Sequence, residues 1–213
     1  MPRYLQNSRK LFMERLSKEF MDPYKNRSFL YKAWYFIWKD NSLLSWLINI
    51  LLAFILVKFL IYPGLGLVLD TTHPVVAVVS GSMEHDIPFE QWWEMYGGWY
   101  EEKGITQEEF LRFDFKNGFN QGDIMVLRGN KPELINIGDT IVFRGNSNNP
   151  IIHRVVHKWK DAEGYHFQTK GDHNSDSSSG LGETDIFETD VIGKATFRIP
   201  YLGWFKIGFS QLL

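Results

Sequence analysis

A serine at position 82 lies in the word SGSM at 80–83, directly after a run of apolar residues at 75–79. A serine hydroxyl is a weak nucleophile at neutral pH, so a serine hydrolase needs a base within hydrogen-bond reach and a group that orients this base. The chain has 213 residues and no cysteine, which excludes a thiol nucleophile, disulfides and thiolate zinc sites. Ser82 is therefore the first candidate for covalent chemistry.

Residues of the two other types that a serine hydrolase needs occur further along the chain. His153 follows a pair of isoleucines, and Asp172 and Asp176 lie in the word TKGDHNSD at 169–176. Each lies at or near the end of an apolar run, where a rigid strand can hold it in place. An aspartate after a glycine is also a common turn former, so spacing alone does not establish a triad.

The elements that must position these residues are mainly strands. Short runs rich in Val, Ile and Phe alternate with Gly-Asp and Gly-Asn pairs, which is typical of a compact, mainly antiparallel β domain. The stretch 89–121 differs, because tryptophans and tyrosines mix with Glu and Gly and a helix-like segment begins at Thr106. We expect a helical insertion there, with its tryptophans at a bilayer surface or packed against the domain. The expected strands are 75–79, 124–127, 140–144, 151–156, 165–169 and 191–199.

An apolar run at 43–69 precedes this domain and is long enough for a membrane anchor, since about 20 apolar residues span a bilayer. Polar residues at 40–42 can cap the helix, and Pro63 and the glycines after it weaken its far end, so we expect the helix at about 42–62. The chain then divides into a basic, partly helical segment at 1–41, an anchor and exit at 42–69, and a catalytic β domain at 70–213.

The segment before the anchor is rich in Lys and Arg. The positive-inside rule places this end in the cytoplasm and the β domain outside it, as in a single-pass protein of the cell membrane. Apolar residues recur in the segment at helical spacing, which predicts an amphipathic helix on the inner leaflet or a solvated tail helix. These apolar residues are Leu5, Phe12, Met13, Leu16 and Phe20.

The local words of the β domain resemble those of the type I signal peptidases of archaea and of the eukaryotic endoplasmic reticulum. They occur in the order of that family and cover nearly the whole soluble part. The words are SGSME at 80–84, GDIMVL at 122–127, GDTIVFR at 138–144, IIHRV at 151–155, TKGDHN at 169–174 and DVIGKATFRIPYLGW at 190–204.

The resemblance implies roles for individual residues. Ser82 matches the family nucleophile, and the hydroxyl of Ser80 matches a group that helps the main-chain N–H of Ser82 to hold the oxyanion. His153 stands where the bacterial branch has a lysine base. We take Asp176 as the residue that orients His153 and Asp172 as the alternative.

Two departures from the family pattern affect this site. Ser177 and Ser178 stand where the pattern has one or two aspartates. His85 stands where the family word continues with proline, and it is a rival base, although His153 matches the family word and is preferred. The insertion at 89–121 is also longer than the usual link.

The expected function is that of a membrane-bound serine endopeptidase that removes N-terminal signal peptides from secreted preproteins through an acyl-enzyme. Its partners would be preproteins and the lipid bilayer, and the resemblance is compatible with an association with the translocation machinery. We expect no cofactor, no metal and no nucleic acid. The alternatives are a catalytically silent, membrane-tethered subunit that binds peptides, and a related protease with a different anchored substrate.

Overall fold

The computed structural model describes residues 28–129, 131–204 and 207. The chain divides into two compact units, Met1–Ile61 and Tyr62–Leu213. The amphipathic helix expected between Leu5 and Phe20 lies outside the described residues.

The first unit contains helices α2 (Phe29–Trp38) and α3 (Leu43–Leu56). Ser42 caps α3, because its hydroxyl accepts a hydrogen bond from the main-chain N–H of Ser45. The side chains of Ser45 and Asn49 donate to main-chain carbonyls of α2. The polar residues within this apolar helix therefore bind the preceding helix.

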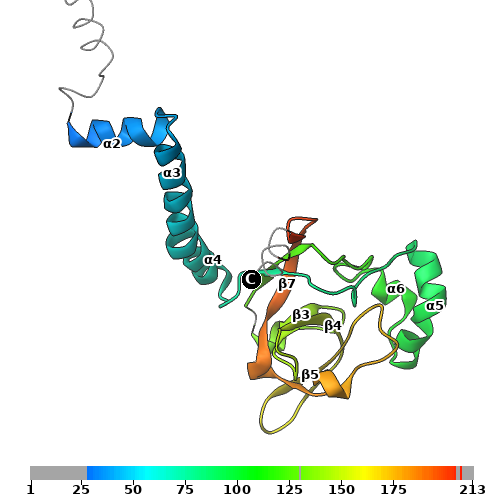
Figure 1. The fold of residues 1–213 in the computed structure, drawn as a ribbon. Coiled ribbons are helices and arrows are strands. Elements are labelled where there is room, and N and C mark those ends of the chain that lie inside the picture. Colours follow the sequence, from blue (N-terminus) through cyan, green and yellow to red (C-terminus); the bar gives the residue numbers. More distant parts are fainter. Residues whose placement is uncertain (1–27, 130, 205–206, 208–213) are drawn as a thin grey trace, which may run out of the picture. The chain divides into compact units, whose positions relative to one another are not determined.

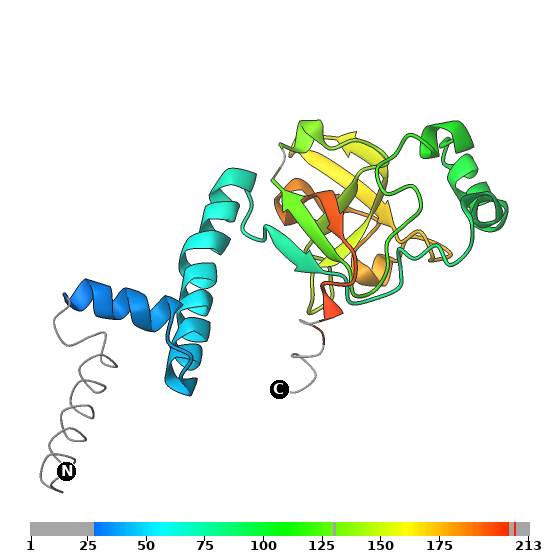
Figure 2. The ribbon, with the colours of Figure 1, turned by 90° about the horizontal axis from the view of Figure 1, so that it is seen from above.

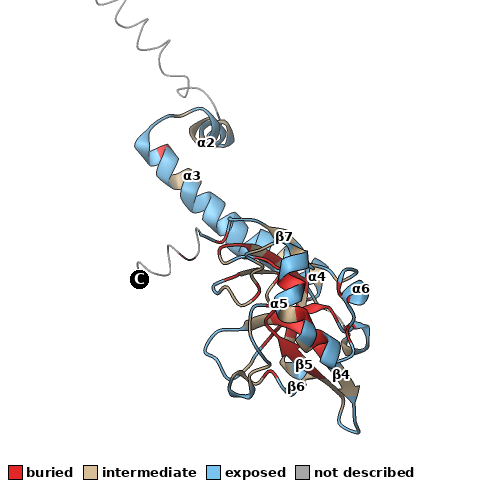
Figure 3. Cartoon of the chain, turned by 90° about the vertical axis from the view of Figure 1, so that its right-hand side faces the viewer, coloured by how far each residue is buried: buried red, intermediate tan, exposed pale blue. Residues whose placement is uncertain are grey.

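The apolar helix is longer than predicted. A π-helical segment (Val57–Ile61) and helix α4 (Tyr62–Leu69) extend it, giving one span of 27 residues at Leu43–Leu69 that is long and apolar enough to cross a membrane. The π-helical segment ends at Ile61, two residues before Pro63, which has no N–H to donate. A local change of helical pitch accommodates such a residue, so the helix continues beyond the predicted end at about 62. In Figure 3, α3 is mostly exposed.

The second unit contains a curled sheet (Figures 1 and 2). The sheet is antiparallel, with seven strands in the order β1-β2-β7-β3-β4-β5-β6. The predicted mainly β domain with a helical insertion is confirmed, and β6 is the strand that the sequence analysis missed. The strands are β1 (Val75–Ala77), β2 (Ile124–Arg128), β3 (Thr140–Phe143), β4 (Ile151–Lys160), β5 (Tyr165–Lys170), β6 (Ile186–Phe187) and β7 (Val191–Ile199). Short 3-10 helices occur at Pro132–Leu134, Ser179–Leu181 and Glu188–Asp190.

Strand β3 is buried on both faces. Val142 packs into one apolar cluster with Met83, Met125 and Leu127. Successive side chains of a strand point to opposite faces, so the neighbours of Val142 on β3 pack into a second cluster. The members of this second cluster are Ile135, Ile141, Phe143, Val155, Phe167 and Ile186.

The insertion forms helices α5 (Phe89–Glu102) and α6 (Gln107–Phe110). A capping box at Thr106 starts α6 at the predicted place. An aromatic cluster that also contains Val156 of β4 buries Trp92 and Trp93. These two tryptophans therefore pack the insertion against the β domain.

Truncation of Leu127, which is fully buried in the sheet core, should lower the free energy of unfolding. We expect Leu127→Ala to cost about 2–5 kcal/mol, because it removes apolar contacts and leaves a cavity. Leu134→Ala is the matched control, since this leucine is exposed, and it should cost less than about 1 kcal/mol. Urea unfolding of the full chain in detergent measures both, and equal losses would contradict the assigned core.

Candidate active site

Ser82 lies in a tight turn that follows β1. The main-chain N–H of Glu84 donates to the carbonyl of Gly81 at 3.0 Å, which closes the turn. Met83 follows Ser82, and its side chain is fully buried in the sheet core. This burial anchors the turn to the sheet. The carbonyl of Ser82 also accepts from the N–H of His173 at 2.9 Å. The hydroxyl is thus presented by a turn that is held at both ends.

His153 lies in the centre of the sheet on β4, opposite Ile141 of β3. Its side chain is 4% exposed, and its Nε2 lies 2.8 Å from the Oγ of Ser82. A strand buried on this face leaves the imidazole little freedom to rotate. The structure therefore brings together the two residues that the sequence analysis selected as nucleophile and base.

The carboxylate on the other nitrogen of His153 is that of Glu183, which the sequence analysis did not select. Oε1 of Glu183 accepts a hydrogen bond from Nδ1 of His153. Because a carboxylate only accepts, the Nδ1 atom carries the proton and Nε2 is free to accept from the hydroxyl of Ser82. The three side chains form a continuous chain from a hydroxyl through an imidazole to a buried carboxylate.

Glu183 is itself fully buried and held by its neighbours. Its Oε2 accepts from the main-chain N–H of Ser178 at 2.8 Å, and its carbonyl accepts from the N–H of Thr169 on β5 at 2.9 Å. Gly182, directly before it, has φ +79°, a left-handed conformation that favours glycine. This turn brings Glu183 back to the sheet beside β5, the strand that pairs with the strand of His153.

Asp176 and Asp172 have other partners. Asp176 is exposed and accepts from the indole N–H of Trp99 at 3.1 Å. Asp172 is fully buried and binds Arg154, His85 and Tyr100. Among the described residues, the carboxylate that contacts His153 is therefore that of Glu183 and of neither aspartate, because the loop after Asp172 turns outward before it returns to the sheet. The signal in the sequence is the Gly-Glu pair at 182–183, which follows the serine-rich loop.

His85, the rival base, also has partners other than Ser82. Its Nε2 is 3.0 Å from the Oδ2 of Asp172, and its ring stacks on Trp92 with the centroids 3.8 Å apart. It is therefore part of the contact between the insertion and the domain.

Gly171 makes room for the imidazole. A Cβ atom built on it would lie 2.9 Å from the Nε2 of His153 and 2.8 Å from the carbonyl oxygen of Ser82. A side chain at this position would displace the imidazole of His153 or the turn of Ser82. The Gly-Asp word at 171–172 thus allows close approach of the backbone to the site.

The Oγ atoms of Ser80 and Ser82 lie 3.2 Å apart. Among the described residues, none accepts a hydrogen bond from the main-chain N–H of Ser82. A substrate carbonyl placed against Ser82 therefore has one free main-chain donor and one neighbouring hydroxyl within reach. Within the described ranges, no group of three or more His, Asp or Glu side chains is arranged to hold a metal ion.

Ionisable groups are buried beside Ser82, His153 and Glu183. Burial, the largest single effect, opposes ionisation of Asp172. The charge of Arg154 and the hydrogen bonds from His85 and Arg154 together outweigh it and hold the pKa of Asp172 well below its usual range. Burial lowers the pKa of Lys170 to about 8, although the carboxylates of Asp172 and Glu183 act in the opposite direction. Burial, followed by the charge of Asp172, raises the pKa of Tyr100 well above its ordinary value. The phenol is therefore a donor at neutral pH.

The chain is similar to catalytic subunits of signal peptidase. It is 28% identical over 158 residues to the signal peptidase complex catalytic subunit SEC11 of Colletotrichum graminicola, covering 72% of this chain and 73% of that protein. It is 29% identical over 154 residues to SEC11C of Homo sapiens, covering 70% of this chain and 63% of that protein, which is less than two thirds of its length. It is 25% identical over 158 residues to SEC11 of Fusarium vanettenii, covering 72% of this chain and 73% of that protein.

No protein-family model matches the chain. The relatives nevertheless confirm the resemblance to type I signal peptidases of the endoplasmic-reticulum branch that the motifs indicated.

The lowered pKa of Lys170, about 8, makes stability depend on pH in a way that can be tested. Between pH 8 and about 10.4, the unfolded chain binds more protons at Lys170 than the folded chain, so stability rises with pH. The difference in the free energy of unfolding between wild type and Lys170→Met should rise by up to about 3 kcal/mol over this window. Urea unfolding at several pH values measures it, and a constant difference would contradict the burial of this ammonium group.

Proposed function

We propose that this chain is a membrane-bound serine endopeptidase that removes N-terminal signal peptides from secreted preproteins. The observation that carries the proposal is the chain of contacts from Ser82 through His153 to Glu183. The Oγ of Ser82 lies 2.8 Å from the Nε2 of His153, and a buried carboxylate holds the other nitrogen. The names of the relatives supply the substrate class, because they are catalytic subunits of the signal peptidase complex.

The proposed reaction has two halves. His153 takes the proton of Ser82 as the Oγ attacks the scissile carbonyl carbon. The main-chain N–H of Ser82 and the hydroxyl of Ser80 hold the negative oxygen of the tetrahedral intermediate. The C–N bond then breaks, and His153 gives its proton to the leaving amine. Water, activated by His153, hydrolyses the ester on Ser82 and restores the hydroxyl.

Glu183 acts in this proposal through His153. Its carboxylate accepts from Nδ1, which keeps the lone pair of Nε2 directed at Ser82. It also stabilises the imidazolium that forms while His153 carries the proton. Glu183 therefore takes the role that the sequence analysis assigned to Asp176.

The apolar span Leu43–Leu69 supports a membrane location for the enzyme. The basic residues before the anchor favour an N-terminus in the cytoplasm and a catalytic unit on the opposite side. We propose that the chain acts there as the catalytic component of an assembly like that of its relatives.

Ser82→Ala should abolish cleavage, because Ser82 supplies the only hydroxyl that contacts Nε2 of His153 in the part of the chain that the structure describes. We expect turnover of a secretory precursor to fall by at least about 10⁴-fold in detergent. Ser175→Ala is the control, since this serine is exposed in the neighbouring loop, and it should leave turnover unchanged. Cleavage is read by the mass of the mature product, which must begin after the hydrophobic segment of the precursor. Wild-type turnover by Ser82→Ala would refute the proposed function.

Glu183→Gln should reduce kcat by about 10²–10⁴-fold while the protein remains folded. The amide can present its NH₂ group to Nδ1 and so favour the imidazole tautomer that cannot accept from Ser82. Asp176→Asn changes a carboxylate in the same loop and should alter kcat by less than about 3-fold. Steady-state kinetics of the two variants decides the assignment, and a larger loss in Asp176→Asn would return the role to Asp176.

A further inference from the structure

The insertion contacts both chain segments that flank the catalytic imidazole. This inference rests on the proposed function and concerns what the insertion does for it. On β4, the residue after His153 is Arg154, and in the loop after β5 the residue after Gly171 is Asp172. We define the aspartate network as Asp172, Arg154, His85 and Tyr100.

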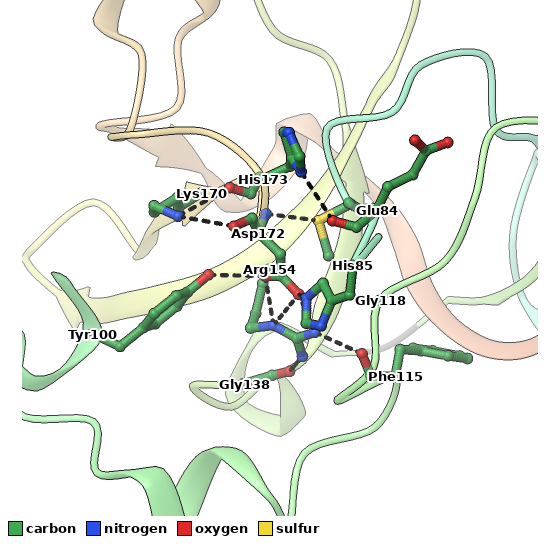
Figure 4. Close-up of polar contacts among 12 residues, drawn as sticks. Glu84, His85, Tyr100, Phe115, Gly118, Gly138, Arg154, Lys170, Asp172 and His173 are labelled. Carbon is green, nitrogen blue, oxygen red and sulfur yellow. Dashed lines mark hydrogen bonds and ion pairs between the residues drawn. The ribbon is translucent and has the colours of Figure 1, made fainter. Parts of the chain in front are cut away.

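Asp172 is the centre of the aspartate network (Figure 4). Arg154 donates to it from Nε at 2.9 Å and from Nη2 at 2.7 Å. Tyr100, on α5, donates to Oδ1 at 2.9 Å, and the Nε2 of His85 donates to Oδ2 at 3.0 Å. The aspartate and the arginine are both fully buried. A buried ion pair is stable only when its remaining hydrogen-bonding positions are filled, and here the insertion and its entry supply two of the donors.

The far end of the insertion holds the guanidinium of Arg154. Nη1 donates to the carbonyl of Asp114 at 3.0 Å, and Nη2 donates to the carbonyl of Phe115 at 2.9 Å. The ring of Phe110 lies under the guanidinium, with the centroid 4.7 Å from Cζ. The insertion therefore surrounds the side chain that follows the catalytic histidine.

His85 is the residue that docks the start of the insertion. Gly118 lies against its ring, because a Cβ there would be 2.7 Å from Cδ2. Stacking on Trp92 covers one face of the imidazole. Within the described part of the chain, the buried Nδ1 has no hydrogen-bond partner, so the neutral ring with its proton on Nε2 fits the contact to Asp172. The ring is thus fixed as a donor to Asp172.

A shift of the aspartate network would move Gly171 and so displace His153 and Ser82. Gly171, next to Asp172, packs against the Nε2 of His153 and the carbonyl of Ser82. A displacement of about 1 Å in a catalytic group can cost about 10²-fold in rate. A small displacement of Asp172 would therefore disturb the alignment of His153 with Ser82.

We propose that the insertion at 89–121 is a positioning module for the catalytic histidine, and that His85 and Tyr100 are positioning residues. They act by filling the hydrogen bonds of Asp172 and so holding Gly171 against His153. The proline that the family pattern has in place of His85 could not make this contact, since proline carries no side-chain donor.

The test compares Tyr100→Phe, His85→Leu and the double variant in the full chain in detergent. We expect the double variant to lower kcat by about 10–100-fold with KM changed by less than about 3-fold. His85→Gln keeps a side-chain donor and should retain kcat within about 3-fold of wild type. The downfield proton resonance of the Nδ1–H of His153, which reports its contact with Glu183, should shift or broaden in the double variant only.

Met95→Ala is the matched control, because this side chain lies on the same helix, α5, and is exposed. It should leave kcat, Tm and the resonance unchanged. An unchanged kcat and resonance in the double variant would overturn the inference. If the double variant does not fold, Tyr100→Phe decides alone, since it removes a single oxygen and should still lower kcat by about 5-fold or more. An active Ser82→Ala sinks the proposed function, whereas an inactive Ser82→Ala with a fully active Tyr100→Phe sinks only this inference.

Discussion

The buried ion pair between Arg154 and Asp172 constrains the rest of the catalytic unit. Both side chains are fully buried, and removing ions of this kind from water costs several kcal/mol each unless every donor and acceptor is satisfied. The nitrogens of Arg154 therefore bind carbonyls from the insertion and from Gly138, and the oxygens of Asp172 take donors from the insertion and its entry. The pair joins β4, the loop after β5 and the insertion, so these segments cannot move independently. His153 and Gly171 are the neighbours of the two ions in the chain, and they share this rigidity.

The contact of Glu183 with His153 comes from a loop that departs from the family pattern. Ser178 stands where the family pattern has an aspartate. In the structure its main-chain N–H donates to Glu183, and its hydroxyl caps the short helix Ser179–Leu181 that leads to Glu183. In the family pattern, position 178 would supply a carboxylate side chain. Here its main chain instead binds the carboxylate of Glu183. The main chain of Glu183 lies beside Thr169. The side chain of glutamate is longer than that of aspartate and reaches from there to the imidazole of His153.

Residues that lie in or beside a regular apolar strand pattern could be placed from the sequence. Ser82 and His153 lie in or next to strands of Val and Ile, and those strands formed within a few residues of the expected bounds. The far end of the apolar helix was not predictable from Pro63, because a π-helical segment accommodates it. Strand β6 is two residues long and carries no period. Glu183 was missed because its position depends on the path of a loop whose only local signals are Gly182 and a carboxylate.

This difference follows from what each member of the site must do. In the proposed mechanism, Ser82 places one oxygen on a substrate carbon, so it needs a turn fixed by the burial of Met83 and by main-chain hydrogen bonds. His153 must reach that oxygen, and a central strand holds it there. The third group acts on the imidazole and not on the substrate, so any buried carboxylate that reaches Nδ1 can serve, from any position in the chain. The orienting residue is therefore the part of such a site that can change its place in the sequence, and its identity follows from geometry and not from alignment of motifs.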